Sequence, residues 1–142
     1  MIRKIGGPAR HIGLAAAILT AAGATAQSPP SLAGGAYSAS QSAHGAEVYA
    51  QHCASCHGKV LTEGSAPPLT GPFWNSWSGR SLAELYQLIQ GAMPADAPSS
   101  LSDADYAAVI AHMLKVGGYP AGSADLPASP DALAPIKIGP PR

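Results

Sequence analysis

The sequence is short of cysteine, of charge and of aromatic side chains. It has two cysteines in 142 residues, which excludes a zinc site built from four cysteines of this chain. Charged residues make up 11% and aromatic ones 6%, whereas glycine and proline number 16 and 14. This composition supports only a thin hydrophobic core, and a small domain of that kind normally needs a further staple, such as a large bound group.

The N-terminal region lacks an apolar run long enough to cross a bilayer. Basic residues precede a short apolar segment, residues 12–22, and Ala24-Thr25-Ala26 forms a small-x-small site before Gln27. This order is typical of a cleavable signal peptide, which we expect over residues 1–26 and which would direct the protein to the periplasm. A retained anchor is the alternative, but we expect no stable membrane insertion.

Cleavage at this site would change the net charge. The full sequence has eight basic and eight acidic residues, and the mature chain would keep five basic residues against eight acidic ones, a formal charge of −3. A nucleic-acid-binding protein is expected to carry a basic patch. The acidic balance therefore argues against nucleic acid as a partner.

The sequence Cys53-Ala54-Ser55-Cys56-His57 has the attachment pattern of c-type haem. Its two thiols are about one helical turn apart, so both can form thioethers with the vinyl groups of one porphyrin. His57 is then the candidate proximal ligand of the iron. A CxxC pair also occurs in redox dithiols and zinc sites, but no valine- or isoleucine-rich strand precedes this one to make a βα redox unit.

A proline- and glycine-rich segment, residues 58–73, follows the motif and is expected to form a stiff loop. A metal-bound histidine usually donates its other ring N–H to a carbonyl, which fixes its tautomer. Pro67 is the candidate for that carbonyl. Leu69 is expected to press its side chain on the haem face.

A second candidate ligand lies in Gly91-Ala92-Met93-Pro94, where glycine and proline favour a bent, restrained loop. The thioether of Met93 is a soft, neutral donor that would complete a His/Met pair and raise the reduction potential relative to two imidazoles. Met113 is the alternative methionine, although its place in an apolar helical stripe favours a core position. The remaining alternatives are an open sixth site or one of three histidines, His44, His52 and His112.

Three longer helices are expected around these motifs. The first is capped by Ser42 and runs to Gln51, the second opens on a capping box at residues 81–84, and the third is capped by Ser102 and ends at Gly117-Gly118. Apolar residues of the second helix form a stripe that core packing explains without a cofactor.

Two features of these segments predict contacts over longer distances. Gly45 lies on the first helix, where a missing side chain would permit the third helix to approach closely, with Val109 or Ile110 entering the gap. Trp74 and Trp77 carry indole N–H groups that seek a partner when buried. A haem propionate is the partner that we expect, with Trp77 as the candidate cofactor contact.

Taken in this order, the motifs resemble those of a class I monohaem cytochrome c. The matching positions are Cys53, Cys56, His57, Pro67, Leu69 and Met93, together with Gly45 and Tyr49 on the first helix. The resemblance covers about residues 42–119. It implies an all-α, small cytochrome c fold, in which the N- and C-terminal helices cross around one covalently bound haem c.

The segments outside this domain have their own patterns. Residues 27–41 are rich in proline, glycine and serine and are expected to be a flexible lead-in. Residues 120–142 are proline-rich with spaced apolar side chains, which fits a disordered tail or an extended strap on the domain or on a partner. Together with the Trp77-to-Met93 arrangement, this strap is similar to cytochrome partners or modules of periplasmic quinoprotein dehydrogenases.

The resemblance implies a single-electron carrier and not an enzyme. The expected donor is a dehydrogenase, with a quinoprotein as the narrower candidate, and the expected acceptor is another cytochrome or an oxidase. Two alternatives stay open from the sequence. One is a dedicated electron-transfer subunit of a quinoprotein dehydrogenase complex, and the other is a haem enzyme or gas sensor with an open sixth site.

Overall fold

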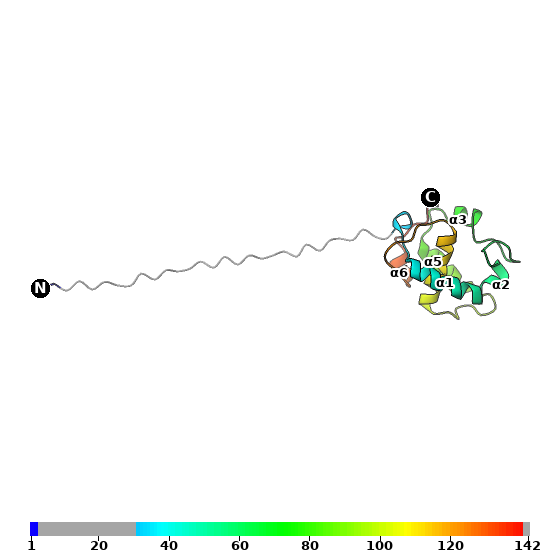
Figure 1. Cartoon of the computed structure of the whole chain (residues 1–142), viewed down its shortest axis with the longest axis horizontal. Coiled ribbons are helices and arrows are strands. Elements are labelled where there is room, and N and C mark those ends of the chain that lie inside the picture. Colours follow the sequence, from blue (N-terminus) through cyan, green and yellow to red (C-terminus); the bar gives the residue numbers. More distant parts are fainter. Residues whose placement is uncertain (3–30, 141–142) are drawn as a thin grey trace.

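The computed structural model of the chain describes Met1–Ile2 and residues 31–140, so the expected signal peptide lies almost wholly outside the described residues (Figure 1). Helices account for the regular structure of this part, which has two isolated β-bridges and no strand, confirming the predicted all-α class. None of its helices is long and apolar enough to cross a membrane. The elements are η1 (Leu32–Gly34), α1 (Ala39–His52), α2 (Ala54–His57), α3 (Pro72–Ser76), α4 (Leu82–Ala92), α5 (Asp103–Val116) and α6 (Pro130–Leu133).

Serine side chains begin the three longer helices. Ser81 and Glu84 form the predicted capping box of α4, and the Ser102 hydroxyl accepts a hydrogen bond from the backbone N–H of Asp105 in α5. The expected cap of α1 is wrong, because the helix starts earlier, at Ala39, and Ser38 is its cap. Ser42 is instead buried within α1, where its hydroxyl donates to the carbonyl of Ala39.

Helices α1 and α5 cross at the centre of the domain (Figure 1). A Cβ atom at Gly45 would overlap the carbonyl group of Ala108, so the crossing requires a residue without a side chain at this point. The predicted close approach of the two helices is therefore present, but the group that occupies the space beside Gly45 is not the expected one. The backbone of Ala108 enters the gap, because the helices are too close for the side chain of Val109 or Ile110 to do so.

The segment before α1 is more ordered than the expected lead-in. Leu32, Ala36 and Tyr37 are buried in the core, and the Tyr37 hydroxyl donates a 2.7 Å hydrogen bond to the carbonyl of Tyr119. The description of residues 27–41 as flexible is thus corrected for residues 31–41. This stretch is bonded to the chain after α5, since the N–H of Gly122 also donates to the carbonyl of Tyr37, and local composition does not show such a contact.

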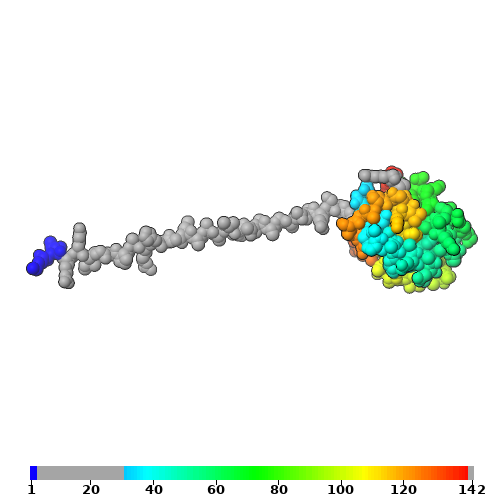
Figure 2. Space-filling model, viewed as in Figure 1, coloured from blue at the N-terminus to red at the C-terminus, as the bar shows by residue number. Residues whose placement is uncertain are grey.

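The C-terminal segment forms a strap on its own domain. Its leucine and isoleucine side chains are all at most 2% exposed, namely Leu126, Leu133, Ile136 and Ile138. Backbone N–H groups before and in α4 donate to the strap, from Gly79 to Ile138 at 2.8 Å and from Leu82 to Ile136 at 2.9 Å. Figure 2 shows strap residues near 120 lying against the start of α1, where Gln41 bonds both backbone groups of Leu126. Residues 121–140 are therefore part of the packed domain.

Candidate haem site

The two cysteines lie where α1 passes into α2. Cys53 ends α1 and begins α2, and its carbonyl accepts a 2.9 Å hydrogen bond from the N–H of His57, which closes one helical turn. Cys53 is half-buried and Cys56 is exposed, and neither forms a disulfide. Burial, with a smaller effect of Cys56, raises the pKa of the Cys53 thiol to about 11. The turn places both thiols at the edge of one cavity.

The loop after the motif fixes the orientation of His57. Nδ1 of this side chain lies 3.0 Å from the carbonyl oxygen of Pro67, as the sequence predicted. Because a carbonyl only accepts, Nδ1 carries a proton, and in the neutral imidazole Nε2 then has its lone pair free for a metal. The loop folds back closely at this point, since the N–H of Ala66 donates to the Cys56 carbonyl and a Cβ atom at Gly64 would overlap that same carbonyl.

Met93 lies at the C-terminal end of α4. Its N–H still donates to the carbonyl of Ile89 at 2.8 Å, but its backbone is already extended, with φ −127° and ψ 152°. The side chain is half-buried, and the following Pro94 is buried. The helix end therefore holds Met93 against the fold at the point where the chain turns away from α4.

One cavity of about 750 Å³ brings these groups together. Six of the seven predicted cofactor-binding residues line it, namely Cys53, Cys56, His57, Pro67, Leu69 and Met93. The remaining wall is mainly apolar, and Asp96 is the one carboxylate among the lining residues. Two thiols, an imidazole with a free nitrogen, a thioether and apolar walls are the donors and surroundings that haem c requires, so the residues present fit this group.

Comparison with known proteins gives one match. The family model described as cytochrome c oxidase, cbb3-type, subunit III matches residues 40–113, which is more than half of the chain. The chain belongs to this family. It is a class I monohaem cytochrome c with one covalently bound haem c and a haem-based electron-carrier domain. No curated protein and no solved structure matches it.

Trp77 is the predicted cofactor contact that this cytochrome does not bring to the cavity. Its indole is buried elsewhere, with the guanidinium of Arg80 3.9 Å from the ring centroid, and it is not a lining residue. Trp74 does not line the cavity either, and its ring packs edge-on against Tyr119. The structure therefore places Trp77 outside the lining of the cavity, with the guanidinium of Arg80 over its ring.

Several cavity residues of the cytochrome were not identified from the sequence. Leu85 and Ile89 of α4 line the cavity, although core packing alone would explain their apolar stripe. Further apolar lining residues are Phe73, Leu88 and Val109, and Met113, the alternative methionine, also lines the cavity. The position of Leu85 and Ile89 could have identified them as cavity residues. The apolar stripe of α4 runs along the helix toward Met93, which lies four residues after Ile89.

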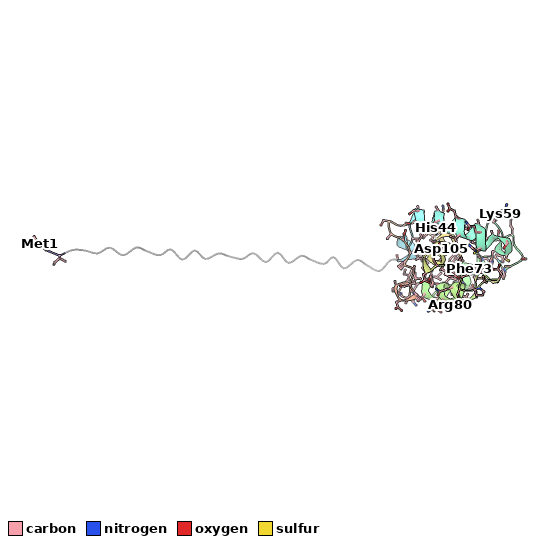
Figure 3. The ribbon with its side chains drawn as sticks, turned by 90° about the horizontal axis from the view of Figure 1, so that it is seen from below. Met1, His44, Lys59, Phe73, Arg80 and Asp105 are labelled. Atoms are coloured by element: carbon pink, nitrogen blue, oxygen red, sulfur yellow. The ribbon has the colours of Figure 1, made fainter. Side chains whose placement is uncertain are left out.

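The three alternative histidine ligands have different surroundings. His44 is exposed, and its Nε2 lies 2.8 Å from a carboxylate oxygen of Asp105; Figure 3 shows the two side chains next to each other. His52 is exposed on the cavity wall. His112 is half-buried on α5, with its ring centroid 5.4 Å from that of Tyr49, and does not line the cavity. The structure thus brings only His52 of these three to the haem site.

His112 predicts a pH dependence of the stability of the cytochrome. Burial, and to a smaller extent Lys115, lowers the pKa of His112 below its ordinary value of 6.5, and its Nδ1 has no partner in the described part of the chain. The unfolded chain then binds a proton more readily, so the free energy of unfolding falls as the pH drops through 6.5. In urea unfolding of the haem-loaded protein between pH 7.5 and 5.5, His112→Gln is expected to flatten this dependence. An equal flattening in the exposed-residue control His52→Gln would contradict the prediction.

Proposed function

We propose that this cytochrome is an exported single-electron carrier whose iron is ligated by His57 and Met93. The observation that supports the proposal is that both side chains line one apolar cavity with the thiols of Cys53 and Cys56. A haem held there by His57 and Met93 would supply a one-electron couple, and the thioether of Met93 would favour its ferrous state.

Different residues of the chain would attach, orient and enclose the haem. Cys53 and Cys56 provide the two covalent attachments, and the Pro67 carbonyl keeps the His57 ring in the tautomer that presents Nε2. Helices α4 and α5 supply apolar walls, on which water finds few hydrogen-bond partners. A site fixed by packed helices changes little in geometry between oxidation states, which suits electron transfer better than the binding of a substrate.

Redox proteins are the proposed partners. A dehydrogenase, with a quinoprotein as the specific candidate, would donate electrons, as the resemblance noted from the Trp77-to-Met93 arrangement and the C-terminal strap implies. Another cytochrome or an oxidase would accept them, and the description of the family as an oxidase subunit supports that direction. Cys56 is exposed at the cavity, and the cavity residue Leu88 is 54% exposed, so a partner can reach this edge in a small, short-lived contact.

Two measurements on haem-loaded protein from an exporting host test the proposal. Optical redox titration is expected to show a reversible couple with one electron per chain. The reduced native protein is expected not to bind carbon monoxide rapidly, because Met93 fills the sixth position. Rapid binding without loss of the fold would instead support the haem enzyme or gas sensor. Stoichiometric co-purification with one dehydrogenase would support the dedicated subunit.

A further inference from the structure

Met93 lies at the start of an exposed connection between α4 and α5. Residues 95–100 of this connection are all exposed, and Pro94 is its buried member. Segments with so few buried contacts are among those that open most readily in a folded protein. A thioether ligand at the base of such a segment needs an anchor elsewhere in the fold to stay in the cavity.

Tyr106, in the first turn of α5, contacts both ends of this connection. Its hydroxyl donates a 2.8 Å hydrogen bond to the carbonyl of Met93 and accepts a longer one, of 3.4 Å, from the N–H of Leu101. The side chain is 1% exposed, yet Tyr106 does not line the cavity. It therefore holds the backbone of Met93 without touching the space in which the cofactor is bound.

We propose that Tyr106 is a positioning residue for the sixth ligand of the iron. Its hydroxyl ties Met93 to α5, while the bond from the Met93 N–H to Ile89 ties the same residue to α4. Met93 is thus fastened to both helices that wall the cavity, and loss of the hydroxyl leaves only the α4 bond. This inference rests on the proposed His57/Met93 ligation and adds the group that maintains it.

The anchoring can be measured by competition for the sixth position. Added imidazole binds the oxidised protein there only when Met93 has withdrawn, so its apparent affinity reports how often that happens. The net contribution of a buried hydrogen bond corresponds to a change of roughly tenfold in such an equilibrium. Tyr106→Phe removes the hydroxyl and leaves the ring in the core.

Tyr86 offers a matched control, because its buried ring lies next to that of Tyr106. It is 0% exposed, and its ring centroid lies 6.3 Å from that of Tyr106. Its hydroxyl donates to a carboxylate oxygen of Asp103 at 3.1 Å and not to the backbone of Met93. Tyr86→Phe thus removes the same chemical group from the same part of the core without changing the anchor of Met93.

The experiment is an imidazole titration of the oxidised, haem-loaded parent and of both variants, followed by the sulfur-to-iron charge-transfer band. Tyr106→Phe is expected to bind imidazole roughly tenfold more tightly than the parent, and Tyr86→Phe to stay within about twofold. The reduction potential is expected to fall in Tyr106→Phe alone, because easier loss of the thioether favours the ferric state. Urea unfolding of each variant records any general loss of stability.

Unchanged imidazole affinity in Tyr106→Phe, or an equal increase in both variants, would overturn the inference. An oxidised parent without the charge-transfer band would overturn the ligation by Met93 itself, so the two failures are distinct. If Tyr106→Phe does not fold, proton NMR of the parent gives the answer. The Tyr106 hydroxyl proton is expected to exchange slowly and to lose its protection when imidazole binds, and protection that persists in the complex would contradict the anchor.

Discussion

Replacing Met93 by alanine is expected to lower the reduction potential by on the order of 0.2 V, a fraction of the range that axial ligands span. Loss of the thioether removes the ligand that favours ferrous iron, and an alanine side chain cannot reach the metal from the end of α4. The sixth position then becomes available, so the reduced variant is also expected to bind carbon monoxide rapidly. Spectroelectrochemistry and a carbon monoxide titration measure the two effects.

Met113 provides the control for this substitution. It also lines the cavity, but it lies on α5 and is 2% exposed, as a core residue would be. Met113→Leu keeps the volume of the side chain and removes only the sulfur, so the potential and the lack of carbon monoxide binding are expected to stay as in the parent. If Met113→Leu gives the large fall in potential and Met93→Ala does not, the two methionines have been assigned the wrong way round.

Gly45→Ala is expected to lower the free energy of unfolding by about 3 kcal/mol or more. The added methyl group would overlap the carbonyl of Ala108, and backbone in the middle of α5 cannot move aside without separating the two helices. Because α1 ends at the cysteine motif and α5 carries part of the cavity wall, such a separation would also disturb the haem site. Urea unfolding of the haem-loaded protein measures the change.

Gly91→Ala is the matched control, since Gly91 is also a helical glycine but has no atom within 4 Å of the added Cβ. It is expected to be neutral or to stabilise the protein by about 0.5–1 kcal/mol, because alanine restricts the unfolded chain and favours the helix. Similar stabilities of Gly45→Ala and Gly91→Ala would show that the crossing of α1 and α5 tolerates a side chain, and the proposed packing would be wrong.

Those parts of the haem site that depend on residues close together in the chain could be predicted from the sequence. The spacing of Cys53, Cys56 and His57 fixes one turn of helix, and a proline ten residues after the histidine places a carbonyl at its ring. The capping box at Ser81 and Glu84 is likewise a local interaction. These features need few contacts from distant parts of the chain, which is why pattern and spacing identify them.

The start of α1 and the packing of both terminal segments were not predictable in the same way. Ser38 and Ser42 are both suitable caps by residue type. The strap decides between them, because Gln41 bonds Leu126 and the Ser38 hydroxyl bonds Asp125, which holds the chain in place one turn earlier. These partners lie more than eighty residues apart, so no local pattern contains the information.

The residues that line the cavity were also difficult to predict from the sequence. Leu85 and Ile89 have the spacing of core residues, and the periodicity of a helix does not distinguish a side chain that contacts protein from one that contacts a cofactor. Trp77 is the predicted cofactor contact that lies outside the lining of the cavity. Its aromatic character suggested a haem contact, whereas in the structure the Arg80 guanidinium covers the ring.

The optical spectrum of the oxidised, haem-loaded protein tests the central claim most directly, namely that His57 and Met93 together close the iron of this cytochrome. Ligation by the thioether predicts a sulfur-to-iron charge-transfer band in the parent that disappears in Met93→Ala. A parent without this band, or a Met93→Ala variant that retains it, would contradict the claim.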